Sequence, residues 1–216
     1  MKKELVFLGP PASGKGTQTD RLSKELNYPH VDTGSLLRKA IADGTEDGKT
    51  AKGYIEKGQL VPVEIVASII KTRLKEADCA NGFILDGFPR TLPQAEALEK
   101  IAKEVNRPID TVINLDCDDK ELIRRISGRR VCKSCGAPYH IDTMRPKVEG
   151  VCDICGGPLF QRADDNEEAL KVRLTHYVNS TKPLLDFYED RKLLSSFNSL
   201  VDSNVLFDEV AKFLEK

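Results

Sequence analysis

The sequence of 216 residues has no tryptophan, few aromatic residues, almost no net charge and no long apolar run. A membrane-spanning helix needs roughly 20 apolar residues. The four apolar residues 5–8 are also too few for a signal peptide. A net charge of −1 and an aromatic share of 6% argue against the basic, stacking surfaces that bind nucleic acid. We therefore expect a cytoplasmic protein that contacts neither membranes nor nucleic acid.

Residues 9–17 carry the strongest functional signal in the sequence. They read Gly-Pro-Pro-Ala-Ser-Gly-Lys-Gly-Thr, and they follow the apolar residues 5–8. Leu22 and Leu26 come next at helical spacing. A strand that passes through a glycine-rich turn into a helix points several backbone N–H groups at one phosphate. The sequence therefore predicts a loop that binds a nucleoside triphosphate.

Individual residues of this loop refine the prediction. Lys15 supplies an ammonium group for the outer phosphates, and Thr17 is placed to offer its hydroxyl to Mg²⁺. Gly16 stands where the strict motif has Ser or Thr, so an ordinary glycine turn is the alternative interpretation. Ala12 is expected at negative φ, because a left-handed alanine costs roughly 1–2 kcal/mol.

Short apolar segments recur along the chain with helical patterns between most of them. The expected strands are residues 5–8, 28–31, 83–85, 112–115 and 199–201. This alternation predicts an α/β protein with a parallel sheet flanked by helices. Polar or glycine residues follow four of the strands at Gly9, 32–34, 86–87 and Asp116. They would gather at the carboxyl edge of the sheet, where such folds bind ligands.

Two segments interrupt this pattern. Residues 32–61 are helical but rich in small and polar residues, which indicates a helical insertion. Residues 128–165 lack helical periodicity and are rich in Cys, Gly and Pro, which indicates a small β-rich module. The remaining ranges, 1–31, 62–127 and 166–216, form the expected core.

Four of the six cysteines form two Cys-x-x-Cys pairs separated by 16 residues. This spacing is typical of a site that holds Zn²⁺ with four thiolates. The predicted ligands are Cys132, Cys135, Cys152 and Cys155. Four protein ligands leave no open position, so the metal would be structural. Two disulfides are the alternative, which a reducing compartment disfavours. Cys79 and Cys117 are expected to be reduced, in or near strands.

At residues 86–94, Asp-Gly-Phe-Pro-Arg-Thr-Leu-Pro-Gln, the sequence resembles adenylate kinases of the bacterial long-lid type. The resemblance spans essentially the whole chain and rests on six ordered motifs. They are Gly-x-Pro-x-x-Gly-Lys-Gly-Thr at 9–17, Asp32-Thr33-Gly34 with Arg38, Gln59-Leu60-Val61, residues 85–90 with Gln94, Gly128-Arg129-Arg130, and Arg162 with Arg173.

The resemblance implies a monomeric enzyme with a P-loop NTPase-like fold that transfers the terminal phosphoryl of MgATP to AMP, giving two ADP. It makes 32–61 the AMP-binding insertion and 128–165 a mobile zinc-binding lid over ATP. The implied AMP contacts are Thr33, Arg38, Gln59, Leu60, Val61, Gly87, Phe88, Pro89, Arg90, Gln94, Arg162 and Arg173. The implied ATP contacts are Gly14, Lys15, Gly16, Thr17, Arg129, Pro138, Tyr139 and Val205. Thr17 and Asp86 would support Mg²⁺ through water.

Phosphoryl transfer needs in-line positioning and positive charge on the phosphate oxygens. The implied catalytic cations are Lys15, Arg38, Arg90, Arg129, Arg162 and Arg173. No histidine is needed as a base, so His30, His140 and His176 are expected to be structural. Ala12, Ser35 and Ser203 depart from the residues usual in the family.

Other functions remain open from the sequence. Another nucleoside monophosphate kinase or a GTP:AMP phosphotransferase is the nearest alternative. Gln94 favours adenine as the acceptor base, because one amide group can both accept from the exocyclic amine and donate to a ring nitrogen. A zinc-ribbon module that binds nucleic acid is a distant alternative, which the charge and composition disfavour.

Overall fold

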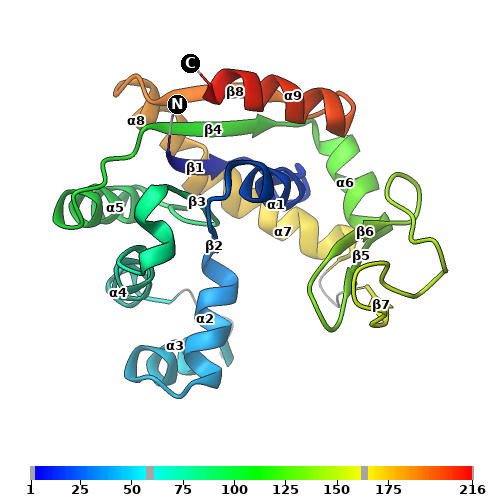
Figure 1. The fold of residues 1–216 in the computed structure, drawn as a ribbon, viewed down its shortest axis with the longest axis horizontal. Coiled ribbons are helices and arrows are strands. Elements are labelled where there is room, and N and C mark those ends of the chain that lie inside the picture. Colours follow the sequence, from blue (N-terminus) through cyan, green and yellow to red (C-terminus); the bar gives the residue numbers. More distant parts are fainter. Residues whose placement is uncertain (1–2, 57–60, 162–164, 216) are drawn as a thin grey trace.

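The computed structural model describes residues 3–56, 61–161 and 165–215. A five-stranded parallel sheet in the order β2-β3-β1-β4-β8 forms its centre (Figure 1). The strands are β1 (Glu4–Leu8), β2 (His30–Asp32), β3 (Phe83–Asp86), β4 (Thr111–Asp116) and β8 (Leu194–Asn198). Parallel neighbours need crossover connections, which the helices provide. The predicted α/β class is confirmed.

Helices connect these strands and cover both faces of the sheet. They are α1 (Lys15–Leu26), α2 (Thr33–Ala42), α3 (Glu46–Glu56), α4 (Val63–Leu74), α5 (Leu92–Glu104), α6 (Asp119–Gly128), α7 (Glu167–His176), α8 (Pro183–Glu189) and α9 (Ser203–Leu214). A 3₁₀ turn, η1 (Ala77–Asn81), precedes β3, and a π-helical turn, η2 (Tyr177–Thr181), joins α7 to α8. None of the described helices is both long and apolar enough to cross a bilayer.

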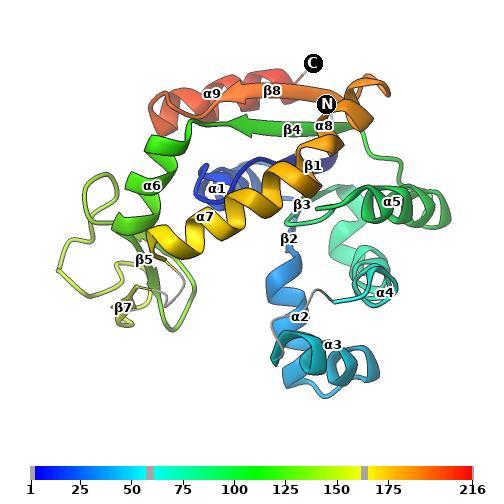
Figure 2. The ribbon, with the colours of Figure 1, turned by 180° about the vertical axis from the view of Figure 1, so that it is seen from behind.

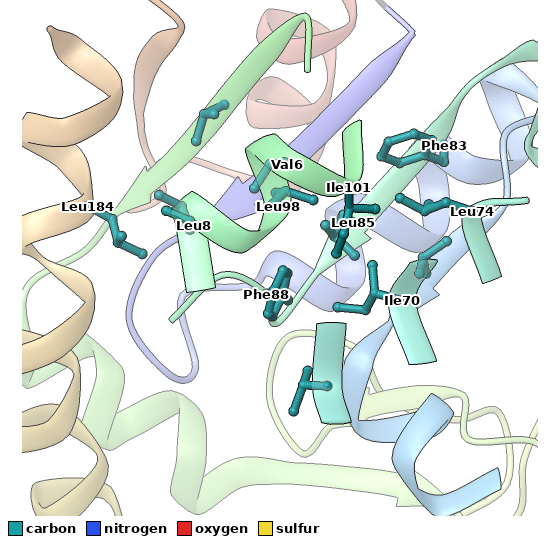
Figure 3. Close-up of a cluster of buried hydrophobic side chains, with 14 of the residues drawn as sticks. Val6, Leu8, Ile70, Leu74, Phe83, Leu85, Phe88, Leu98, Ile101 and Leu184 are labelled. Carbon is teal, nitrogen blue, oxygen red and sulfur yellow. The ribbon is translucent and has the colours of Figure 1, made fainter. Parts of the chain in front are cut away.

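The two faces of β1 belong to two separate hydrophobic clusters, because successive side chains of a strand point to opposite faces. Val6 and Leu8 pack with residues of α4, α5 and α8, as Figure 3 shows for Ile70, Leu98 and Leu184. Leu5 and Phe7 pack on the other side with residues of α1 and α9. Burying each such side chain contributes roughly 1.5–3 kcal/mol, so the central strand is held from both sides.

Two smaller units extend from this central sheet. One contains α2 and α3, and the other contains an antiparallel sheet in the order β6-β5-β7. The strands of this small sheet are β5 (Arg129–Cys132), β6 (Pro138–His140) and β7 (Leu159–Phe160). The two opposite views in Figures 1 and 2 show the α2–α3 unit and the small sheet on different sides of the molecule.

Two strands differ from the sequence-based positions. The last strand was predicted at 199–201 but lies at Leu194–Asn198, and residues 199–200 form a turn. An edge strand is paired on one side only, so β8 needs no continuous apolar run. Its serines therefore hide the apolar pattern by which a strand is predicted. The second strand, predicted at 28–31, begins two residues later at His30 and ends at Asp32. Both errors concern strands at the edges of the sheet.

Candidate active site

The phosphate-binding loop connects β1 to α1. Gly14 has a φ of 93° and precedes α1 without a side-chain hydrogen bond, so the first N–H groups of α1 remain available to an anion. Gly9 has a φ of 141°, and a Cβ there would lie 2.6 Å from the carbonyl oxygen of Leu115. The buried hydroxyl of Ser13 has no hydrogen-bond partner among the described residues. This donor set fits a phosphate group.

Ala12 contradicts the prediction of a negative φ, because its φ is 68°. The left-handed conformation costs an L-residue roughly 1–2 kcal/mol. The methyl group packs against the cluster of Leu122, Ile126 and Leu170, and these contacts offset part of the cost. The sequence concealed this strain because Gly9 and Gly14, earlier and later in the loop, are sufficient to explain a tight turn.

Lys15 begins α1 and turns its side chain back over the loop. Its Nζ atom donates to the carbonyl oxygens of Gly9 at 2.7 Å and Pro10 at 2.8 Å. Burial is the main cause that lowers the pKa of Lys15 to about 8; Asp86 opposes this shift, and the cations Arg90 and Arg129 add to it. The loop oxygens, the Asp86 carboxylate and the two arginines therefore all act on the amine of Lys15. Such an arrangement is expected where phosphates are to be neutralised.

Asp86 ends β3, and the histidine at the start of β2 lies beside it. The Nε2 atom of His30 is 3.5 Å from Asp86 Oδ2, and Nδ1 is 2.8 Å from Asp20 Oδ1. Burial favours the neutral ring, but the hydrogen bonds to Asp20 and Asp86 outweigh it and raise the pKa of His30 to about 9. His30 therefore contacts a predicted site residue, and the helical position of Asp20 gave no signal of this link.

On the acceptor side, Thr33 and Arg38 lie on α2. The hydroxyl of Thr33 donates to the backbone oxygen of Asp86 at 3.1 Å, which ties the start of α2 to the end of β3. Arg38 is exposed and donates to the Ser35 hydroxyl at 2.9 Å, with Asp32 Oδ1 3.5 Å away. Gln59 and Leu60 lie outside the described residues, and Val61 packs at the margin of the core.

Residues 87–90 form the turn after β3. Phe88 is buried in the core, and the neighbouring Pro89 is also buried, so both residues hold this turn against the core. Arg90 is exposed, and its Nε atom donates to the backbone oxygen of Gly87 at 2.9 Å. Its backbone N–H donates to Gln94 Oε1 at 2.7 Å. The amide of Gln94 thus keeps its NH₂ group for another acceptor.

A buried carboxylate binds the predicted phosphate-binding arginine of the lid. Arg129 donates through Nε to Asp165 Oδ2 at 2.8 Å, and its Nη2 atom contacts Oδ1. The Nη1 atom of Arg173 is 4.0 Å from the same Oδ1 atom. Arg162 lies outside the described residues. Asp165 was not among the predicted residues, because an acidic residue before a helix is ordinarily a capping residue.

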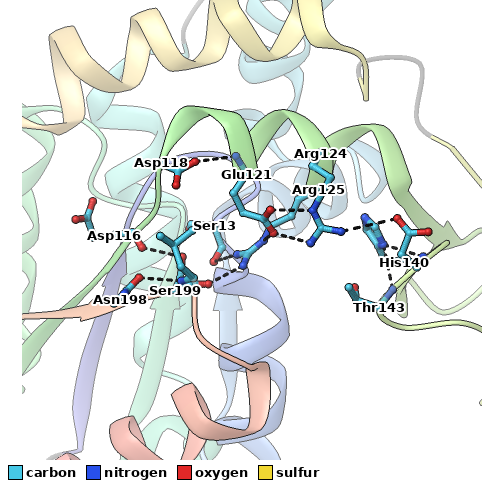
Figure 4. Close-up of polar contacts among 12 residues, drawn as sticks. Ser13, Asp116, Asp118, Glu121, Arg124, Arg125, His140, Thr143, Asn198 and Ser199 are labelled. Carbon is cyan, nitrogen blue, oxygen red and sulfur yellow. Dashed lines mark hydrogen bonds and ion pairs between the residues drawn. The ribbon is translucent and has the colours of Figure 1, made fainter.

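Arg125 is a second residue that the sequence analysis missed (Figure 4). It donates to the backbone oxygens of Ser199 at 2.6 Å and Ser13 at 3.3 Å, and to Glu121 Oε1 at 2.8 Å. It thereby joins α6, the phosphate-binding loop and the turn after β8. Its pattern with Glu121, four residues earlier, indicates an ordinary solvated helix face. Only the tertiary structure shows that it points at the loop.

The remaining ATP contacts implied by the resemblance lie in different surroundings. Gly16 is exposed and Thr17 half-buried in the first turn of α1. Pro138 is half-buried in β6, but the Tyr139 side chain is buried and donates to the Sγ atom of Cys152 at 3.5 Å. Val205 is exposed in the first turn of α9.

All four predicted metal ligands come together in the small sheet unit. Their Sγ atoms lie within 4.8 Å of one another, with Cys132 and Cys155 at 3.4 Å and Cys135 and Cys152 at 3.6 Å. Tetrahedral Zn²⁺ with Zn–S bonds of about 2.3 Å separates its sulfurs by about 3.8 Å, so the cluster fits this ion. The Tyr139 hydroxyl lowers the pKa of the Cys152 thiol, which favours the thiolate that binds metal.

Comparisons with known proteins agree with this arrangement. The family model described as Adenylate kinase matches residues 7–193. An adenylate kinase of Methanothrix thermoacetophila is 51% identical over 98% of each chain, and one of Methanosarcina barkeri is 50% identical over 98% of each. An adenylate kinase of Caldicellulosiruptor bescii is 52% identical over 88% of each chain.

A parallel sheet whose first strand leads into a phosphate-binding loop, with arginines from separate segments around it, suits an enzyme that transfers phosphoryl groups between nucleotides. The matches to adenylate kinases over nearly the whole chain narrow this class to one family. The chain belongs to the adenylate kinase family, and it is an enzyme that converts ATP and AMP to two ADP.

Proposed function

We propose that ATP binds to the loop of residues 9–17 and the lid, and that AMP binds between α2 and the turn after β3. The observation that carries this assignment is the position of Lys15, whose Nζ atom lies over the loop, 2.7 Å from the Gly9 oxygen, and within the electrostatic influence of Asp86, Arg90 and Arg129. Arg90 comes from the acceptor side and Arg129 from the lid. A phosphoryl group shared between the two nucleotides would lie between these cations.

The residues act by binding and orientation. Lys15 and the first N–H groups of α1 hold the outer phosphates of ATP, while Arg38 and Arg90 hold the phosphate of AMP. Arg162 and Arg173 also contact the phosphate of AMP, and together with Arg129 they add positive charge where it develops on the transferring group. Gln94 recognises the adenine of AMP. Because arginine never loses its proton, these contacts persist across the physiological pH range.

Mg²⁺ is the proposed cofactor of the donor nucleotide. Thr17 and Asp86 offer a hydroxyl and a carboxylate, the oxygen donors that Mg²⁺ prefers, and both would hold the ion through its water ligands. When bound, the ion neutralises charge on the phosphate oxygens. His30 fixes the Asp86 carboxylate from the side.

We further propose that residues 32–61 and 128–165 are separate closing units on a core formed by 1–31, 62–127 and 166–216. Closure over both nucleotides would exclude water and so prevent hydrolysis of ATP. Zn²⁺ held by the four cysteines would stabilise the lid and take no part in the reaction. We propose a cytoplasmic monomer.

A coupled assay that pairs each of four nucleoside triphosphates with each of four monophosphates tests the substrate assignment. The ATP and AMP pair is expected to give the highest kcat/KM, and omission of Mg²⁺ is expected to abolish turnover. A higher kcat/KM with GTP and AMP would instead identify a GTP:AMP phosphotransferase.

A further inference from the structure

The connection between α7 and α8 departs from α-helical geometry. Residues Tyr177–Thr181 form the π-helical turn η2, in which the N–H of Lys182 donates to the backbone oxygen of Tyr177 at 2.9 Å. A π turn inserts one extra residue into a helix and rotates the side chains that follow it. Such turns are frequent at functional sites.

Thr181, the last residue of η2, uses its hydroxyl differently from three threonines that lie within other helices. The hydroxyls of Thr50, Thr72 and Thr175 each donate to the backbone oxygen four residues earlier in the same helix. For Thr181 that oxygen belongs to Tyr177 and already accepts from Lys182. The Thr181 hydroxyl instead donates to the backbone oxygen of Arg90, at 3.0 Å.

This hydrogen bond joins two segments that each carry a proposed phosphate-binding arginine. Arg90 lies in the turn after β3, and Arg173 lies on α7, the helix that η2 continues. The backbone of Arg90 is then held at both polar atoms, because its N–H donates to Gln94 Oε1. Its exposed side chain donates from Nε to the Gly87 oxygen.

We propose that Thr181 is a positioning residue for AMP binding: through the Arg90 backbone it fixes the guanidinium groups of Arg90 and Arg173 relative to each other. The proposal rests on the assignment of both arginines to the phosphate of AMP. Two arginines bind one phosphate well only when their spacing is set in advance, because correct placement otherwise costs binding energy.

Thr181→Val tests this role, because valine keeps the shape of threonine and removes the hydroxyl. One neutral hydrogen bond contributes about 1 kcal/mol, so the KM for AMP is expected to rise about fivefold. The KM for ATP should stay within twofold of wild type. Thr181→Ser retains the hydroxyl and should restore the KM for AMP.

Thr175→Val is the matched control, since within the described residues the Thr175 hydroxyl donates to the oxygen of Lys171 on its own helix. Both valine variants should melt at similar temperatures, which separates positioning from general stability. Equal KM values for AMP in the two variants would overturn the proposal, as would an equal rise in the KM for AMP and ATP in Thr181→Val. If Thr181→Val fails to fold, Thr181→Ala is measured against Thr175→Ala by the same criteria.

A double-mutant cycle shows whether Thr181 acts through Arg90. In the Arg90→Ala background, adding Thr181→Val should leave the KM for AMP unchanged within twofold, because there is no guanidinium left to position. An undiminished fivefold effect would refute action through Arg90. If Arg90→Ala alone leaves the KM for AMP unchanged, the assignment of Arg90 to AMP is itself wrong, which is a separate failure.

Discussion

The carboxyl groups of Glu4 and Asp110 share a hydrogen bond at the amino ends of β1 and β4. Asp110 Oδ2 also accepts from the backbone N–H groups of Lys3 at 2.7 Å and Glu4 at 3.2 Å. Burial opposes ionisation of Asp110, but these donors outweigh it and lower its pKa. Burial is the largest cause, and Asp110 the second, of the rise in the pKa of Glu4 to about 7. The shared proton therefore belongs to Glu4.

This pair predicts a pH-dependent stability. Glu4 keeps its proton in the folded state up to about pH 7, but releases it near 4.5 when exposed, so folding binds a proton between these values. The contribution of Glu4 to stability is complete below pH 4.5 and is lost as the pH rises through 7. Glu4→Gln cannot ionise and should therefore melt at a higher temperature than wild type at pH 8, with little difference at pH 5.

Melting curves of both proteins between pH 5 and 8 measure this effect. Glu25→Gln, which removes an exposed charge on α1, is the control and should follow the wild-type profile. A profile of Glu4→Gln parallel to wild type over this range would show that the carboxyl pair does not couple folding to proton binding.

Lys15→Met is expected to keep the fold and to lower kcat by at least about a hundredfold, the typical effect of removing one donor to a developing charge. Methionine has a similar length but cannot donate to phosphate. Among the described residues the amine donates to the loop oxygens of Gly9 and Pro10, so its loss should cost little stability. Circular dichroism and the coupled assay measure the two effects. Near-normal turnover in a folded variant would remove Lys15 from the mechanism.

Gln94→Ala should raise the KM for AMP more than the KM for ATP. Of the two nucleotide bases, the amide is proposed to contact that of AMP alone. Its Oε1 atom also accepts from the Arg90 N–H, so the variant loses two interactions in the AMP site. Initial rates with one nucleotide varied and the other saturating give both constants. An equal loss of affinity for ATP would mean that the assignment of the donor and acceptor sites has to be exchanged or abandoned.

The sequence predicted best those parts in which neighbouring residues act together. The loop at 9–17, the apolar strand before it and the Cys-x-x-Cys pairs are local patterns, and the structure places them as expected. Edge strand β8 was misplaced, because a strand paired on one side has no distinctive apolar run.

Contacts between residues far apart in the chain were not predictable. Asp20 and Asp86 are 66 positions apart in the sequence. The ring of His30, on β2, contacts both carboxylates and so links them. Arg125 reaches Ser199 across 74 positions. Charged residues on helices usually face solvent, so neither pattern distinguishes a site residue from a surface residue. The packing of helices on the sheet decides which of them point at the loop.

Ala12→Gly is expected to stabilise the protein slightly. Relief of the left-handed alanine favours glycine by roughly 1–2 kcal/mol. The greater backbone freedom of glycine in the unfolded chain costs about 0.5–1 kcal/mol. Loss of the methyl contacts with Leu122 and its neighbours reduces the gain further. The free energy of unfolding should therefore rise by less than about 1 kcal/mol.

Denaturant titration can resolve this change against Ala169→Gly, a helical control in α7 that should destabilise by about 1 kcal/mol. Equal destabilisation by both substitutions would mean that the methyl contacts of Ala12 exceed the cost of its conformation.

The lid is expected to depend on metal for its stability. Its buried cluster consists of Cys132, Ala137, Tyr139 and Cys152, so two of its four members are themselves predicted ligands. Other apolar side chains of the unit, such as Val148 and Ile154, are exposed. So small a core cannot order the unit without a cross-link. Binding of structural Zn²⁺ contributes on the order of 10 kcal/mol, and this energy is coupled to folding.

Cys152→Ser should therefore lower the melting temperature markedly, while activity measured well below that temperature persists at least in part. Metal analysis should find one ion per chain in the wild type, and replacement by another tetrahedral divalent ion should preserve catalysis, because four protein ligands leave no position for substrate. Limited proteolysis should cut the metal-free lid first. If chelation abolished activity at once, with melting unchanged and the lid still protease-resistant, the metal would have to take part in the reaction.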